Sequence, residues 1–380
     1  MKGRFLTTHV GSLPRTQAVV DVIFARERGE TIDEAAFDAL MRDAVDDVVA
    51  CQVQAGVDIV SDGEMSKISY ATYIKDRFTG FDGDSPRRTP ADLQDYPGFM
   101  KRLAAGGGTP SYRRPCCVGP IGVKTLEPLA KDIAHLKMAM AKHGAAQAFM
   151  NAASPGVVAL FQPNRHYGND DEYLQALAHA LRHEYHEIVD AGLILQLDSP
   201  DLGLGRHMMY KDLDEPAYLA RIERHVEALN FALAAIPAER VRMHICWGNY
   251  EGPHHKDVPL ATILPTVLRA KPQGLLFESS NPRHAHEWET IERMKRSIPD
   301  DKILIPGVLD STTNFIEHPQ LVAQRIGRFA DIVGRERVIA GTDCGFGTFA
   351  GFGAVDADIV YAKLAAMAAG AAIASVSHWT

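Results

Sequence analysis

The feature that most restricts the fold of this chain is a repeated alternation of short apolar runs and segments with helical spacing. Each run ends in small or polar residues, which is typical of a strand that turns into a helix. Eight such runs occur: VDIVSDGE ending at Glu64, PCCVGPIG around Gly119, GVVALFQPN ending at Asn164, LILQLDSP with Asp198, RVRMHICWG with His244 and Cys246, GLLFESS with Glu278, KILIPGVLD ending at Asp310, and RVIAGTDCG with Cys344.

The segments between the runs predict amphipathic helices, for example over residues 131–153, 172–192 and 215–236. Their apolar residues recur every three or four positions, as in helices that cover a sheet. Eight strand–helix units favour a closed (β/α)8 TIM barrel over an open sheet. We therefore expect a single barrel domain over residues 1–380, with an N-terminal extension. An insertion or lid is expected at residues 81–115, a stretch rich in Gly, Pro, Asp and Arg that contains Gly106–Gly108.

The composition argues for a globular enzyme with small-molecule partners. The 46% hydrophobic content is ample for a large core, and the formal net charge of -8 disfavours binding to nucleic acid or to anionic membranes. The N-terminal residues MKGRFLTTHVGS lack an apolar signal core, and we find no uninterrupted apolar run that would span a bilayer. A cytoplasmic location is expected. The sequence leaves the oligomeric state open, and a homo-oligomer is compatible with it.

Polar residues at the ends of the expected strands form a candidate metal site. His244 and Cys246 are one residue apart on a strand, so their side chains share a face, and Glu278 and Cys344 end two other strands at the same rim. Two thiolates, an imidazole and a carboxylate suit tetrahedral Zn²⁺. Because the ligands come from distant strands, we expect a catalytic site and not a zinc finger. The odd total of five cysteines also disfavours a disulfide framework.

The motifs THVGSLPR, SDGE, a Gly-Pro strand end, QLDSP, HIC, FES, GVLD and TDCG follow one another in an order that resembles the C-terminal catalytic domain of cobalamin-independent methionine synthase. The chain is also similar to shorter single-barrel relatives, which include epoxyalkane:coenzyme M transferase. The resemblance runs from Thr7 to about Phe352. It implies a zinc-dependent alkyltransferase of the TIM-barrel type.

The resemblance also implies roles for individual residues. Zinc is held in this family by a His-x-Cys pair, a Glu and the Cys of a DCG turn, which correspond to His244, Cys246, Glu278 and Cys344. Homocysteine is held by residues that correspond to Ser12, Glu64 and Asp198. Coordination to Zn²⁺ turns the substrate thiol into a thiolate at neutral pH, and that thiolate attacks an electrophilic carbon.

Two departures from the family pattern concern the methyl donor. A catalytic His is expected two residues after Asp310, where this chain has Thr312, and the Trp expected after the Gly-Pro motif is missing. A histidine of the GPHH segment, His254 or His255, is a candidate replacement for the proton donor. We name Asp310 and His255 as candidate catalytic residues.

Three functions fit these residues. The first is methyl transfer to homocysteine, giving methionine, from an unidentified donor. The second is attack of a coenzyme M type thiol on an epoxide, with Arg15, Arg206 or Lys67 as candidate contacts for its sulfonate. The third is a non-catalytic thiol-binding barrel. Each has a small-molecule thiol as partner, and the first two add an alkyl donor.

Overall fold

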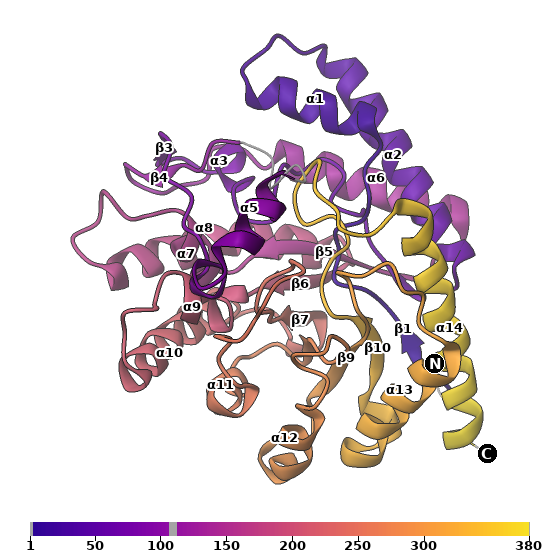
Figure 1. Ribbon diagram of the computed structural model, residues 1–380. Helices are drawn as coiled ribbons and strands as arrows, with labels where there is room; N and C mark the ends of the chain where they lie inside the picture. The colour runs from indigo at the N-terminus through magenta and orange to yellow at the C-terminus, as the bar shows by residue number, and fades with distance from the viewer. Residues whose placement is uncertain (1–2, 106–111, 380) are drawn as a thin grey trace.

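The structure is a computed structural model that describes residues 3–105 and 112–379. Eight parallel strands form a nearly closed ring at its centre, and helices surround them (Figure 1). The order of neighbouring strands is β1-β10-β9-β8-β7-β6-β5-β2. These strands are β1 (Leu6–Thr7), β2 (Ile59–Val60), β5 (Gln147–Ala153), β6 (Ile194–Asp198), β7 (Val241–His244), β8 (Gly274–Phe277), β9 (Ile303–Leu309) and β10 (Ile339–Thr342). The predicted (β/α)8 barrel is confirmed.

Hydrogen bonds link the two ends of the strand order. The Asp58 N–H donates to Thr7 O at 3.2 Å, and the Thr8 hydroxyl donates to Ile59 O at 3.0 Å. β1 also pairs in parallel with β10. The N-terminal segment, expected to extend the barrel, therefore supplies its first strand.

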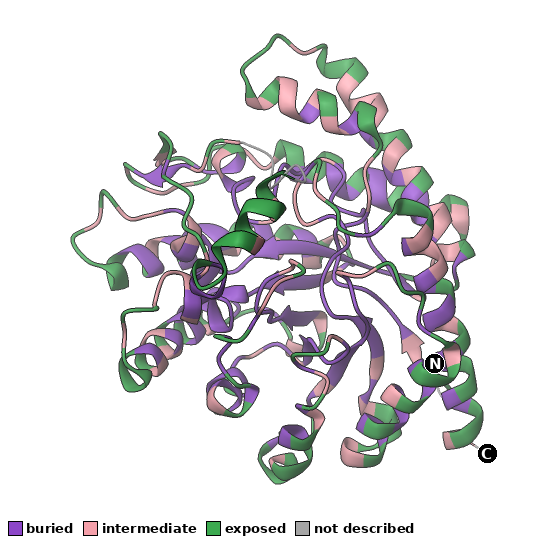
Figure 2. Ribbon diagram, in the orientation of Figure 1, coloured by how far each residue is buried: buried purple, intermediate pink, exposed green. Residues whose placement is uncertain are grey.

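The helices alternate with the strands along most of the chain. Their outer faces are exposed, whereas the strands are buried (Figure 2). They are α1 (Gln17–Glu27), α2 (Glu34–Gln54), α3 (Ile74–Arg77), α4 (Ala91–Gln94), α5 (Pro97–Ala105), α6 (Glu127–His143), α7 (Pro155–Phe161), α8 (Asp170–Asp190), α9 (Gly205–Met208), α10 (Glu215–Ala232), α11 (Leu260–Val267), α12 (Trp288–Arg293), α13 (Pro319–Val333) and α14 (Ala357–Trp379). Four short 3-10 turns lie at Pro200–Leu202, Ala238–Arg240, Lys295–Ser297 and Arg335–Arg337.

Two of the eight expected strands were misplaced. The run GVVALF forms α7 and not a strand, because Ser154 caps it by accepting from the Val157 N–H and a proline occupies its first turn. The barrel strand is the preceding β5, which was expected to be helical. Gly144, in the left-handed conformation at φ 72, ends α6 before β5 begins.

The second misplaced strand is the Cys116–Cys117 run. It forms β4, which pairs antiparallel with β3 (Phe81–Asp82) in a separate two-stranded sheet outside the barrel. The two thiols are buried and free. This sheet brings together the two ends of the stretch that was expected to be an insertion.

The insertion expected at 81–115 contains α4 and α5, and its Gly106–Gly108 lie outside the described residues. Asp92 anchors it and is fully buried. The Asp92 carboxylate accepts the Tyr250 hydroxyl at 2.6 Å and the His254 N–H at 3.0 Å. The insertion is thereby fixed to the loop that follows β7.

The barrel interior holds a buried arginine beneath the rim. Arg242 donates to Gln196 Oε1 at 2.7 Å and to His9 O at 3.0 Å, and it lies 3.6 Å from the centre of the Phe149 ring. Burial lowers the pKa of Arg242 to about 9, against the opposing charge of Asp198. Arg242 and His244 are two positions apart on β7, so both point into the barrel.

α14 is long and apolar enough to cross a membrane by length and composition, although Asp358 and Lys363 interrupt its apolar sequence. In the structure it lies along α13, with Gly370 against Val322. A core helix passes the same test of length and composition. The finding is therefore weak evidence for a membrane span.

Candidate metal centre

His244, Cys246 and Cys344 converge at the carboxyl ends of β7 and β10. One ligand atom from each lies within 4.8 Å of the others, and all three residues are buried. Beyond His244 the strand pairing continues, because the Ile245 N–H donates to Leu276 O at 3.0 Å. The extended backbone keeps the side chains of His244 and Cys246 on one face, as the spacing predicted.

The electrostatics of this group favour a bound cation. Burial lowers the pKa of His244, but the hydrogen bond to Asp198 and the charge of Cys246 outweigh it and raise that pKa to about 9. The hydrogen bond from Cys344, aided by the charge of His244, lowers the pKa of Cys246 despite burial. One imidazole and two sulfurs in a pocket that attracts positive charge fit a zinc ion.

Glu278 follows β8 directly but stands outside this convergent group. Its Oε1 accepts the Trp247 N–H at 2.7 Å, and its Oε2 accepts from Asn281 Nδ2 at 2.7 Å. Burial raises the pKa of Glu278. Each of its oxygens keeps a second lone pair, so a role as the fourth ligand requires the carboxylate to lie closer to the convergent group but not to lose these hydrogen bonds.

Asp343 connects the ligand-bearing loops, a role that the sequence did not indicate. Its carboxylate accepts the backbone N–H groups of Ser279, Ser280 and Asn281 at 2.8 to 2.9 Å. Its backbone oxygen lies 3.2 Å from His244 Nε2. Asp343 thus joins the loop after Glu278 to the imidazole of β7. The signal available in the sequence was an acidic residue next to the Cys of the TDCG turn.

Ser12 lies against the turn that carries Cys344. The Phe346 N–H donates to Ser12 O at 2.8 Å. A side chain at Gly345 would overlap Ser12 Oγ, so only glycine fits there. The loop after β1 therefore sits beside the convergent group.

Glu64 and Asp198 lie near one another, and Asp198 adjoins the convergent group. Asp198 Oδ1 is 3.5 Å from His244 Nδ1, and its Oδ2 accepts from Asn151 Nδ2 at 3.0 Å. Glu64 is 2% exposed and has φ 58, a left-handed conformation that is rare outside glycine. Burial raises the pKa of Glu64 to about 7, and the charge of Asp198 contributes to this rise.

Several buried polar atoms beside these carboxylates have no hydrogen-bond partner. Three are able to accept: Glu64 Oε2, Asn151 Oδ1 and Ser199 Oγ. Arg15 Nε is a buried donor without a partner. Buried polar groups are nearly always paired in folded proteins, so these atoms indicate a place for a polar ligand.

The two residues named for catalysis are engaged elsewhere. Asp310 Oδ1 accepts the N–H and the hydroxyl of Thr312, each at 2.8 Å, and its Oδ2 accepts the Thr313 hydroxyl at 3.1 Å. His255 is exposed, and its Nε2 lies 2.9 Å from Asp95 Oδ2 in the insertion. Neither side chain is brought into the convergent group.

A buried network of imidazoles borders the site and was not anticipated as a unit. His254 and His284 both contact Asp257 Oδ2, at 2.9 and 3.0 Å. The second nitrogen of His284 lies 3.0 Å from Glu287 Oε2, and its ring stacks on Trp247 at 4.2 Å. With acceptors at both nitrogens, His284 is a cation, and its two carboxylate partners help raise its pKa to about 10 against burial. The network fixes the loop next to Cys246.

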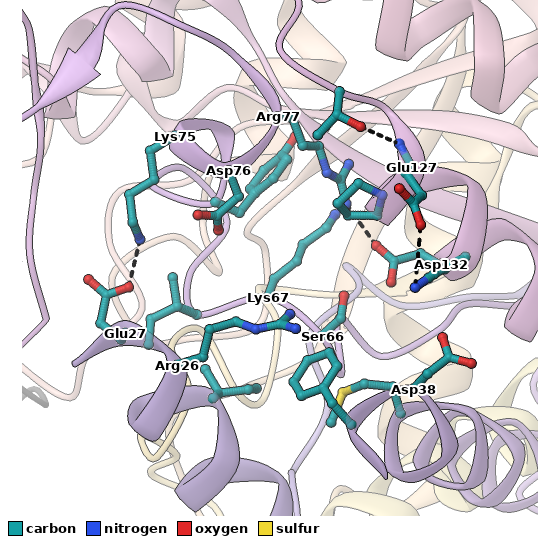
Figure 3. A pocket seen from close by; sticks show the side chains of 18 of the residues that line it. Arg26, Glu27, Asp38, Ser66, Lys67, Lys75, Asp76, Arg77, Glu127 and Asp132 are labelled. Atoms are coloured by element: carbon teal, nitrogen blue, oxygen red, sulfur yellow. Dashed lines mark hydrogen bonds and ion pairs between the residues drawn. The ribbon is translucent and has the colours of Figure 1, made fainter. Parts of the chain in front are cut away.

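A cavity of about 450 Å³ lies outside the loop that carries Glu64, between α1, α2 and α6 (Figure 3). Its charges are largely paired with one another: Lys75 contacts Glu27 at 2.7 Å and Arg77 contacts Asp132 at 2.7 Å. Lys67 lines this cavity, but its Nζ donates to Asn151 O at 2.6 Å. Lys67 therefore separates the cavity from the candidate site.

Comparisons with known proteins identify the family. The family model for the cobalamin-independent synthase catalytic domain matches residues 5–85 and 111–369. A methionine synthase from Saccharolobus solfataricus is 26% identical over 365 residues, which cover 96% of this chain and 93% of that protein. The 2-hydroxypropyl-CoM lyase of Xanthobacter autotrophicus is 27% identical, covering 89% of this chain and 88% of that protein.

A solved structure shows the same fold. The B12-independent methionine synthase from Shewanella sp. W3-18-1, in complex with selenomethionine, superposes with a TM-score of 0.74 and 19% identity, and the match covers 98% of each chain. The ordered motifs, the barrel and the family match agree, and the chain belongs to the cobalamin-independent synthase family, as a member of its catalytic-domain group.

Proposed function

We propose that this protein is a zinc-dependent thiol alkyltransferase that methylates homocysteine to methionine. The observation that carries the proposal is the set of unpartnered buried acceptors at Glu64, Asn151 and Ser199, next to the convergent His244, Cys246 and Cys344. An ammonium group has three donors and no acceptor, so it complements such a set. Homocysteine joins an ammonium and a thiol in one small molecule.

We propose His244, Cys246, Cys344 and Glu278 as the zinc ligands. Zinc in this position would hold the substrate sulfur as a thiolate at neutral pH. The hydrogen bonds of Glu278 to Trp247 and Asn281 keep its carboxylate beside the group, where it is available as a ligand.

The other site residues orient the substrate in this proposal. Glu64 and Asp198 take the ammonium through charge-assisted hydrogen bonds, which fix both distance and direction in a buried site. Ser12 lies beside Gly345 and is within reach of the substrate's polar end. The free Nε of buried Arg15 suits the carboxylate.

The second candidate is the lyase reaction, and the Xanthobacter relative favours it. A coenzyme M type thiol carries a sulfonate, which needs cations. Lys67 already donates to Asn151 O, and Arg206 Nη1 donates to Tyr210 O at 2.9 Å. Arg15 donates through its two Nη atoms to the backbone oxygens of Gly347 and Glu64, which leaves only its Nε without a partner. The excess of free acceptors over free cations supports the amino thiol.

We also propose that the described part of the stretch 81–115 covers the barrel mouth within one catalytic domain. The contacts of Asp92 with Tyr250 and His254 support this, because they attach the insertion to the loop after Cys246.

Titration calorimetry of the zinc-loaded protein with homocysteine and with coenzyme M tests the proposal. Homocysteine is expected to bind and coenzyme M to bind weakly or not at all. Binding of coenzyme M alone would favour the lyase reaction. Tight binding of homocysteine without turnover by any alkyl donor would favour the non-catalytic barrel.

A further inference from the structure

Five aromatic side chains form a cluster at the rim of the barrel. The ring centres of Tyr70 lie 5.9 Å from those of Phe161 and of Phe349, and the Phe349 ring lies 5.7 Å from Tyr112 and 6.0 Å from Phe352. All five are only partly buried. Rings that pack in this way and keep part of their surface open form a π-rich wall. We call these residues the aromatic cluster.

The aromatic cluster lies next to the convergent group. Phe349 belongs to the loop that begins at Cys344, and it bridges to Ser69, the neighbour of Tyr70. Burial raises the pKa of Tyr70 well above its ordinary value. The loop that carries Phe349 lies beside the site, because the Phe346 N–H donates to Ser12 O and Arg15 donates to both Gly347 O and Glu64 O.

The donor side of the barrel mouth, where the methyl donor would bind, has few groups that can protonate a leaving group. A methyl group on a neutral amine leaves only if the nitrogen gains a proton. Asp310 accepts from Thr312 and Thr313, and His255 is paired with Asp95 at the surface. Tyr70 holds its proton tightly. Among the described residues, none of the three candidates Asp310, His255 and Tyr70 is placed to act as an acid for that proton.

Glu64 is a further acid to consider, since its pKa is about 7. In the proposed function, however, Glu64 faces the ammonium of homocysteine, and an adjacent positive charge favours the ionised carboxylate. With homocysteine bound, Glu64 is therefore an anion and holds no proton to give.

We propose that the methyl donor is a methylsulfonium compound whose cationic head lies against Tyr70 and Phe349. This inference rests on the proposed function and names its second substrate class. The acceptor thiolate sulfur forms a bond to the methyl carbon with its own electron pair. The bond from that carbon to the sulfonium sulfur breaks, and its pair stays on sulfur, which leaves as a neutral thioether. No proton enters the step, so the site needs no acid.

The surroundings complement a cation. Aromatic faces attract sulfonium and quaternary ammonium heads through the negative charge of the ring face. The carboxylate of Asp198 contributes negative charge at Tyr70. A neutral thioether product loses this attraction, which favours its release.

Trimethylsulfonium is the simplest probe of this inference. We expect the zinc-loaded protein with homocysteine to form methionine and dimethyl sulfide from it, at a rate that does not fall as pH rises above 8. If 5-methyltetrahydrofolate is used and trimethylsulfonium is not, the inference is overturned while the proposed function stands. If homocysteine does not bind in calorimetry, the proposed function itself fails.

Variants of Tyr70 test the contact. Tyr70→Leu removes the ring and should raise the KM for trimethylsulfonium about tenfold, whereas Tyr70→Phe keeps the ring and should leave it near the original value. Tetramethylammonium gives a second readout that does not depend on turnover: its binding to the metal-free protein should weaken in Tyr70→Leu. Tyr96→Leu, at an exposed tyrosine of the insertion, is the matched control. Equal KM values in Tyr70→Leu and the control would overturn the contact.

Discussion

The two sides of the barrel mouth differ in how their polar groups are satisfied. The acceptor side, at Glu64, Asn151 and Ser199, keeps buried atoms without partners, whereas the carboxylate of Asp310 on the donor side accepts three hydrogen bonds from its own loop. Unpaired buried acceptors are costly and persist where a ligand completes them. The Asp310 carboxylate already has hydrogen-bond partners and does not need a ligand to complete them. The difference indicates that the acceptor side binds the polar, cationic end of the thiol substrate. The donor side binds a methyl donor whose head group needs no hydrogen bonds.

The largest expected effect is on zinc affinity, because the acceptor side and the donor side both depend on the proposed zinc ion. Cys246→Ser removes one sulfur of the convergent group, and the zinc affinity should fall by more than about 100-fold, beyond what loss of a supporting residue costs. Metal analysis and competition with a chromophoric chelator measure this. Cys51→Ser, on α2, is the control and should keep full stoichiometry. Unchanged zinc affinity in Cys246→Ser would contradict the assignment of Cys246 as a zinc ligand, on which both sides of the comparison depend.

Glu64→Gln tests the acceptor side alone. The substitution keeps the shape but removes the charge that faces the ammonium, so homocysteine should bind about 10- to 100-fold more weakly. Binding of 4-mercaptobutyrate, which lacks the amino group, should be unaffected and serves as the control ligand. An equal loss for both ligands would mean that Glu64 acts on the structure of the site and not on the ammonium.

The pH dependence sharpens this test. The pKa of Glu64 is raised to about 7 in the empty site, and the substrate's ammonium favours the ionised form. Affinity from this group is therefore full above pH 7 and weakens as pH falls, by up to about tenfold per unit. Calorimetry across pH 5.5 to 8.5 should show one fewer linked proton in Glu64→Gln than in the unaltered protein.

The sequence predicted the position of the convergent group better than that of His255, for a physical reason. His244 and Cys246 owe their position to two-residue strand periodicity, and Cys344 to the end of another strand. Such local rules can be read without knowing the packing. His255 depends on an ion pair with Asp95, which is far away in the chain, and no local pattern indicates that contact.

The misplaced strands have a similar cause. Both the QAFMNAA and GVVALF runs are apolar and buried, so hydrophobicity alone does not separate strand from helix. The caps at Gly144 and Ser154 do separate them, and they were the usable signals. The network of His254, His284 and Asp257 forms only when two loops meet, which lies beyond sequence periodicity.

The smallest expected effect is at His255, and it tests whether the donor side works without an acid. The pair of His255 with Asp95 is exposed, and pairs of this kind contribute less than about 1 kcal/mol to stability. His255→Ala should therefore change neither kcat nor the zinc content, and Asp95→Ala should match it in a thermal unfolding assay. A fall in kcat of about 100-fold or more, the range typical of a lost general acid, would place His255 in the reaction. It would also mean that the insertion moves on donor binding, because His255 now faces Asp95 and not the convergent group.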